Sequence, residues 1–157
     1  VGYMPIGADP YDPQVRRRGA FEEAVNGAAV VRGAGQAGMT GALTAKQVFA
    51  LARKGDPRAG RVVQDEASRI ALGLAVVIAV VDLELVILGG GVGGNADLLL
   101  APVERELRAL SPLQPRLAVS ALGEDAILQG AVATALAVAQ SRLFDPATML
   151  DRKELVV

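Results

Sequence analysis

The fold of this 157-residue chain is decided by residues 84–94, which read ELVILGGGVGG. The β-rich run over residues 84–88 predicts a short buried strand of a parallel sheet. The glycines after it predict a sharp turn into an amphipathic helix over residues 95–110, because glycine adopts backbone conformations that other residues avoid. A strand, a glycine turn and a helix in this order are typical of α/β proteins, whose ligands bind beyond the carboxyl ends of the strands.

Gly89, Gly90 and Gly91 are the candidate nucleotide-type turn. Their backbone N–H groups can approach a ligand that a Cβ atom would exclude. The pattern lacks the G-x-G-x-x-G spacing of dinucleotide-binding proteins, and no Walker lysine follows it. The same residues are compatible with a tight turn that needs glycine only for packing, so both interpretations stay open.

The residues before this turn predict three helical stretches. The first covers residues 20–33, and the second, residues 45–54, begins after a capping threonine and ends at a glycine. The third begins at Pro57 and continues to residue 81. No polar face remains from Ile70 onward, which predicts a helix that is buried on all sides.

The two ends of the chain are less regular. Residues 1–19 predict a short strand and a loop, which ends in three arginines at 16–18, either a solvated corner or a phosphate contact. Residues 116–120 predict a second strand and residues 125–144 a helix of small side chains. The tail, residues 145–157, is expected to dock or fray. Two or three strands are too few to cover these helices, so the sheet is expected to be incomplete.

Composition restricts the chemistry of the chain. It has no cysteine and no histidine, which excludes disulfides, a thiol nucleophile and an ordinary zinc site. The net charge of −1 provides no basic field for DNA or anionic lipid. The apolar run over residues 70–81 is too short to span a bilayer. We therefore expect a cytoplasmic protein without a membrane segment.

Four stretches, residues 50–57, 82–92, 98–103 and 121–126, resemble in this order the C-terminal half of ROK proteins, the family of repressors, open reading frames and sugar kinases. The resemblance implies an α/β fold, the C-terminal subdomain of the hexokinase/actin-like ATPase (ribonuclease H-like) fold, truncated at its N-terminal strands. It covers nearly the whole chain and implies a single domain over residues 1–157. Self-association is expected because ROK proteins commonly form oligomers.

The chain matches the family signature in spacing but not in its histidine and cysteines. The signature reads Glu-x-Gly-His, nine residues, then Cys-x-Cys-Gly-x-x-Gly-Cys-x-Glu. Tyr3 stands at the histidine position, and the cysteine positions fall on Pro13, Val15 and Ala20. Because the family binds zinc through those side chains, the resemblance implies no metal here. Glu22 matches the final Glu, which contacts sugar hydroxyls in the family. The resemblance makes Glu22 and Tyr3 the expected sugar-binding residues, although Glu22 also fits a first-turn helix carboxylate.

Three functions remain open at this point. The first is the sugar- or effector-sensing domain of a ROK-family transcriptional regulator, with a winged-helix DNA-binding domain upstream and DNA contact only through it. Neither the family's Asp-x-Gly phosphate loop nor its catalytic Asp can be placed in this chain, so we expect no catalytic residue, no cofactor and no enzyme activity. The second is the C-terminal half of an ATP-dependent sugar kinase, and the third a dimerisation module.

Overall fold

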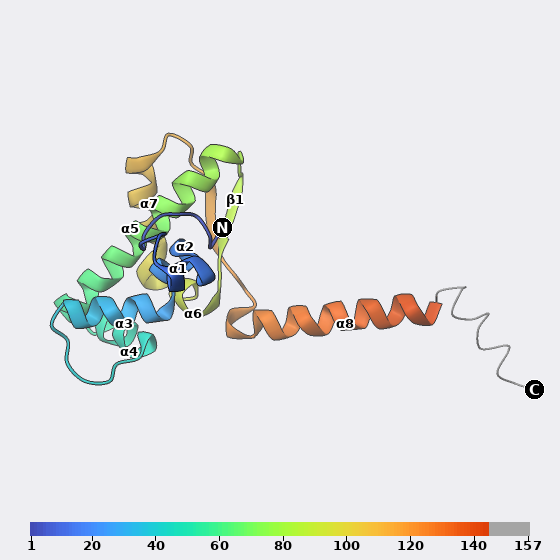
Figure 1. The fold of residues 1–157 in the computed structure, drawn as a ribbon, viewed down its shortest axis with the longest axis horizontal. Coiled ribbons are helices and arrows are strands. Elements are labelled where there is room, and N and C mark those ends of the chain that lie inside the picture. The colour runs from blue at the N-terminus through green and yellow to red at the C-terminus, as the bar shows by residue number, and fades with distance from the viewer. Residues whose placement is uncertain (145–157) are drawn as a thin grey trace, which may run out of the picture. The chain divides into compact units, whose positions relative to one another are not determined.

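The computed structural model of the chain describes residues 1–144, so the predicted behaviour of the tail lies outside the described residues. The chain divides into two compact units, the first ending at Ala121 and the second beginning at Leu122. The first unit contains α1 (Pro13–Arg18), α2 (Ala20–Val25), α3 (Gly27–Gln36), α4 (Ala45–Arg53), α5 (Pro57–Val80), β1 (Leu85–Leu88), α6 (Gly90–Gly93), α7 (Ala96–Leu110) and β2 (Arg116–Val119) (Figure 1). The second contains the 3₁₀ turn η1 (Gly123–Asp125) and α8 (Ala126–Phe144).

The predicted helix starts before the glycine turn are confirmed. Thr44 and Gln47 form a capping box at the start of α4, each side chain bonding the other residue's backbone N–H. Gly55 has φ +86° after the end of α4. Asp56 then begins α5, because its carboxylate accepts hydrogen bonds from the next turn and Pro57 occupies the first helical position.

Two predictions for the N-terminal third are wrong. Residues 1–19 contain no strand and instead form α1, because the Asp12 carboxylate accepts from two backbone N–H groups of that helix and Pro13 is its first residue. The single helix predicted over residues 20–33 is interrupted at Asn26. The extended backbone of Asn26 ends α2, and its side chain accepts from the Ala29 N–H to begin α3.

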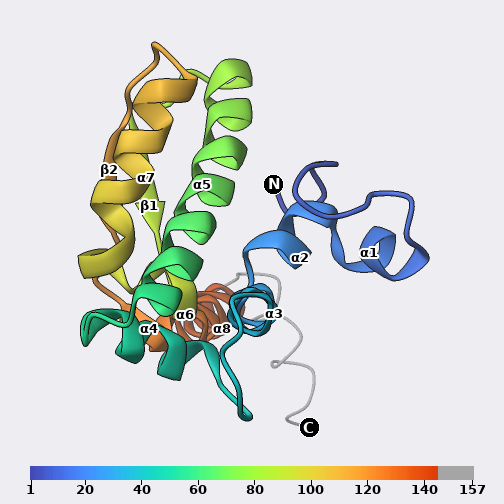
Figure 2. The ribbon, with the colours of Figure 1, turned by 90° about the vertical axis from the view of Figure 1, so that its left-hand side faces the viewer.

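The two strands are parallel, with a register that runs from Leu85 opposite Arg116 to Leu88 opposite Val119. Within the first unit, α5 and α7 lie side by side against one face of this pair (Figure 2). Leu88 is buried on that face, whereas Ile87 points to the other side and is 60% exposed. The predicted burial of β1 therefore holds for one face only, and the two-stranded sheet confirms that the sheet is incomplete.

The core of the first unit lies between α3, α4, α5, α7 and the covered face of the sheet. Its largest fully buried apolar side chains are Phe49, Ile78, Leu99 and Leu107. The other side of α5 is open, since Leu72 is 42% exposed and Val80 more so. The prediction that this helix is buried on all sides is therefore wrong, because two strands are too narrow to enclose it.

In the second unit, α8 is one uninterrupted helix of mostly small and apolar residues. Its window Ala126–Leu143 is long and apolar enough to cross a membrane by length and composition alone. A single helix of this kind is weak support for a membrane protein, because helices of soluble proteins have the same composition.

Candidate functional site

The glycine turn follows β1 directly. Gly89 is extended, with φ −145° and ψ −178°, and leads into α6, a single helical turn. Gly90, the first residue of α6, has φ +73°, and its carbonyl accepts from the Gly94 N–H at 2.9 Å. The turn therefore stands at the carboxyl end of a parallel strand, where the sequence placed it and where α/β proteins bind ligands.

Two glycines of this turn, Gly90 and Gly93, are required by the fold, each for a different reason, and Gly91 is not. Gly90 needs glycine because its positive φ disfavours other residues. Gly93 needs it for packing, since an added Cβ would lie 3.1 Å from the Leu88 carbonyl carbon. Gly91 has neither requirement, because its φ is not positive and, apart from its chain neighbours and the backbone of α6, no atom of the described residues lies within 4 Å of an added Cβ. Packing therefore does not explain Gly91, and the space beside it is open.

A side-chain network connects this turn to the end of α4. Arg53 Nε donates to Asp97 Oδ2 at 2.6 Å, and Arg53 Nη2 donates to Asp97 Oδ1 at 2.7 Å and to Asn95 Oδ1 at 2.9 Å. Asn95 Nδ2 donates to the carbonyls of Gly91 and Val92, at 2.8 Å and 3.0 Å. The glycine turn is thus attached to two longer helices through Asn95.

The charges of this network stabilise one another. The hydrogen bond to Asp97, with the attraction of its carboxylate, raises the pKa of the Arg53 guanidinium. The hydrogen bond from Arg53, with the attraction of its charge, lowers the pKa of the Asp97 carboxyl. Both side chains are partly exposed, so the pair remains ionised around neutral pH.

The expected sugar-binding residues lie together at the start of α2. The Gly2 carbonyl accepts from the Glu22 N–H at 3.1 Å, which brings the segment around Tyr3 beside Glu22. Gly19 allows this approach, because it has φ +98° and an added Cβ would overlap the Gly2 carbonyl. The Glu22 side chain is exposed, and Tyr3 is 72% exposed. Figure 2 shows α2 well apart from α6, so these residues and the glycine turn form separate regions.

The family's zinc does not fit this segment. The ligand positions hold Tyr3, Pro13, Val15 and Ala20, whose side chains offer no imidazole or thiolate. Tyr3 Oη instead donates to the Arg17 carbonyl at 3.3 Å, and Ala20 is buried. Among residues 1–144, no three acidic side chains gather as a metal site, and the absence of bound metal stays a prediction.

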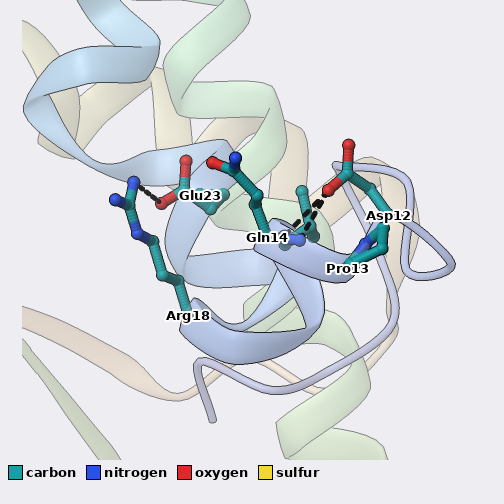
Figure 3. A pocket seen from close by; sticks show the side chains of 6 residues that line it. Asp12, Pro13, Gln14, Arg18 and Glu23 are labelled. Carbon is teal, nitrogen blue, oxygen red and sulfur yellow. Dashed lines mark hydrogen bonds and ion pairs between the residues drawn. The ribbon is translucent and has the colours of Figure 1, made fainter.

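Arg18, the last of the three arginines at residues 16–18, lines a pocket of about 490 Å³ beside α1 (Figure 3). In this view Arg18 reaches toward Glu23, and the two side chains form an ion pair at 3.4 Å. Arg16 and Arg17 are exposed. A phosphate contact at this corner stays a prediction, and the ion pair partly neutralises the charge that such a contact would use.

A buried carboxylate lies between α3 and α5. Glu66 is 0% exposed, and its Oε2 accepts from Arg69 Nη2 at 2.6 Å, while its Oε1 has no hydrogen-bond partner within the described part of the chain. Burial raises the pKa of the Glu66 carboxyl, although Arg69 and Arg32 act in the opposite direction. Sequence analysis did not identify this residue, although its helical spacing from Val62 and Ile70 places it on the buried face of α5.

Sequence analysis also missed Arg53, Asn95 and Asp97 as parts of the glycine-turn region. Arg53 is 42 residues from Asn95 and 44 from Asp97, and no local pattern joins such distant positions. The only local signal was Asn95, a cap-type residue at the predicted start of a helix.

Comparison with known proteins shows that the chain is similar to ROK proteins, among them sugar kinases. A sequence model of the ROK family matches residues 15–138. The N-acetylmannosamine kinase of Yersinia pestis (strain Pestoides F) is 43% identical over 77 residues, which are 49% of this chain and 26% of that protein. The ROK family glucokinase of Streptomyces griseus, solved with glucose and AMPPNP, is 27% identical with a TM-score of 0.65, over 73% of this chain and 43% of that one. The ROK hexokinase of Thermus thermophilus is 33% identical with a TM-score of 0.55, over 73% and 39%.

These findings confirm the predicted family and fold: the chain has part of the actin-like ATPase fold of the ROK sugar kinases, and it spans less than half of the relatives named above. They contradict the expectation of no enzyme activity and favour its alternative, part of a sugar kinase, because the named relatives are kinases. The missing histidine and cysteines did not predict the function correctly, because binding of a structural metal and phosphoryl transfer are separate properties. The transcriptional-regulator hypothesis receives no support from them.

Proposed function

The chain belongs to the ROK family, and from that premise we propose that it forms the nucleotide-binding part of an ATP-dependent sugar kinase. The observation that carries this proposal is the open space beside Gly91, at the carboxyl end of a parallel strand. Neither conformation nor packing requires glycine there, whereas a phosphate group that approaches the backbone does.

The hydrogen bonds of the turn support phosphate binding. The carbonyls of Gly90, Gly91 and Val92 all accept hydrogen bonds from residues 94 and 95. In a planar trans peptide the C=O and N–H point in opposite directions. The N–H groups of Gly91 and Val92 therefore point away from residues 94 and 95, toward the open side of the turn. Backbone N–H groups with a common direction are a frequent means of binding phosphate.

Glu22 is proposed as the sugar contact of this chain. Its carboxylate is exposed at the start of α2, where it can accept hydrogen bonds from hydroxyl groups. The names of the relatives suggest a hexose or an N-acetylhexosamine as the substrate class. In phosphoryl transfer a protein contributes mainly positioning and electrostatic stabilisation, and these residues would supply a share of each.

Nucleotide binding is tested by calorimetry of the chain with ATP and Mg²⁺, with Gly91→Ala as the variant. We expect ATP affinity to fall by about tenfold or more, because the added methyl group enters the space of the phosphate, with an unchanged melting temperature. The matched control is Gly60→Ala in α5, which is also open around its Cβ position and should leave affinity unchanged. Failure of the unchanged chain to bind ATP would refute the proposal.

The activity is tested on the polypeptide in the form that the cell makes. ADP release from ATP should depend on glucose or N-acetylmannosamine, and Glu22→Gln should raise KM for the sugar more than it lowers kcat. Release of ADP at the same rate with and without any sugar of the panel would contradict a sugar kinase, even if ATP binds.

A further inference from the structure

We propose that Arg53 and Asp97 are positioning residues for the phosphate-binding turn and act on it through Asn95. The inference rests on the proposed function, because it concerns the same glycine turn. It adds residues that do not touch the nucleotide, located at the end of α4 and the start of α7. They set the direction of the Val92 N–H, one of the two N–H groups that the nucleotide meets, because this N–H shares a peptide plane with the Gly91 carbonyl.

Asn95 has an amide group with only one orientation that satisfies its neighbours. A guanidinium has donors and no acceptor, so the Asn95 oxygen must face Arg53. The amide nitrogen then faces the carbonyls of Gly91 and Val92 and donates to both. Arg53 thereby fixes the side chain that holds these two carbonyls.

Arg53 is itself held by Asp97. Two parallel hydrogen bonds of 2.6 Å and 2.7 Å join the guanidinium to the carboxylate, which is the bidentate geometry that arginine forms and lysine does not. The same Nη2 atom also reaches Asn95. Loss of the carboxylate would leave Arg53 free to turn toward solvent, since it is partly exposed.

The consequence for the turn follows from peptide geometry. When Asn95 holds the Gly91 and Val92 carbonyls on its own side, the N–H groups in the same peptide planes point to the opposite side. Glycine residues have the largest backbone freedom, so without this restraint the turn would sample many N–H directions. A prearranged turn binds phosphate without the entropic cost of ordering it.

The competing interpretation is that the Arg53–Asp97 pair only joins α4 to α7 and stabilises the fold. The two interpretations differ in Asn95→Asp. This change keeps the size of the side chain and an acceptor for Arg53, but it places a carboxylate oxygen against two carbonyl oxygens. The helix-to-helix pair survives in this variant, and so do the backbone bonds from Gly94 and Asn95 to the turn, whereas the side-chain restraint on the Gly91 carbonyl is lost.

The experiment measures affinity for ATP with Mg²⁺ and for adenosine, which has no phosphate, together with the melting temperature of the whole chain. The variants are Arg53→Gln, Arg53→Lys, Asn95→Asp and the double variant of Arg53→Gln with Asn95→Asp. The matched control is Arg105→Gln, because Arg105 is also exposed and bonded to a glutamine and a glutamate, but along α5 and α7.

We expect each single variant to weaken ATP binding by about tenfold and adenosine binding by less than about twofold. The double variant should bind ATP no more weakly than Asn95→Asp, because both changes interrupt one chain of hydrogen bonds. Arg105→Gln should change neither affinity. Equal loss of ATP and adenosine affinity, or a lower melting temperature with unchanged affinities, would overturn this inference and leave the proposed function intact. No ATP binding by the unchanged chain would overturn both.

Discussion

Two regions of the first unit differ in how they are held. The glycine-turn region, β1, α6 and the start of α7, rests on the buried core and is restrained by five side-chain hydrogen bonds, three of Asn95 and two between Arg53 and Asp97. The N-terminal segment, residues 1–22, is mostly exposed and contains no cysteine or histidine. A phosphate-binding turn needs fixed N–H directions, whereas the N-terminal segment is held by few bonds, among them those from Glu22 to Gly2 and from Tyr3 to Arg17.

The N-terminal segment shows what replaces a metal site. Tyr3 occupies the place of a ligand and donates to the Arg17 carbonyl, while Gly19 packs against Gly2. These contacts preserve the position of Glu22, the one residue of the signature that we propose for sugar binding. The comparison therefore separates two requirements, a rigid turn for the nucleotide and a correctly placed carboxylate for the sugar.

The largest expected effect is on the core beneath the glycine turn. Leu99→Ala in α7 should lower the free energy of unfolding by roughly 2–5 kcal/mol, because the side chain is fully buried and leaves a cavity. Urea denaturation measures the change. Leu72→Ala on the open side of α5 is the control and should cost much less. A similar loss for Leu72→Ala would mean that this side of α5 is covered in solution.

A second prediction concerns the pH dependence of stability through Glu66. Burial raises the pKa of this carboxyl in the folded chain above its ordinary value of 4.5. Between that value and the folded pKa the folded chain keeps a proton that the unfolded chain has lost, so stability rises as pH falls through this window. Each unit of pKa difference contributes about 1.4 kcal/mol.

Glu66→Gln is neutral at every pH and should remove this slope. Urea denaturation at several pH values between neutrality and 4.5 compares the variant with the unchanged chain. Glu23→Gln is the control, because that carboxylate is less buried. If the unchanged chain instead loses stability steadily as pH falls from neutrality, Glu66 is ionised throughout, and this prediction is wrong.

The smallest effect is expected in the N-terminal segment. Tyr3→Phe removes one long hydrogen bond from an exposed side chain and should change the free energy of unfolding by less than about 0.5 kcal/mol. Thermal unfolding by circular dichroism measures it. A loss several times larger would show that the Tyr3–Arg17 bond stabilises the N-terminal segment strongly. That segment would then be held about as firmly as the glycine-turn region.

Local chemistry explains why much of the fold could be predicted from the sequence. Thr44, Asp56 and Gly55 carry capping signals that act within a few residues, and α4 and α5 begin and end accordingly. The strand over residues 85–88 and its glycine turn were predicted for the same reason. The interruption at Asn26 was missed because small apolar residues on both sides continue a helical pattern, while the cap is a single side chain.

The candidate site was harder to predict because its support is not local. Gly89 to Gly91 could be located, but only the structure shows that Gly90 requires glycine for its φ and that Gly91 does not. Arg53 reaches Asp97 through tertiary packing, which no spacing in the sequence reveals. The function was misjudged for another reason: missing metal ligands in the N-terminal segment carry no information about the nucleotide-binding turn.

The most direct test of the two-region account is the amide spectrum of the ¹⁵N-labelled chain during titration with ATP and Mg²⁺. We predict shifts for Gly91 and Val92, because their N–H groups lie at the proposed phosphate site, and none for residues 1–22. Shifts confined to the N-terminal segment, or no shift at the glycine turn at saturating ATP, would contradict the proposal that this turn binds the nucleotide.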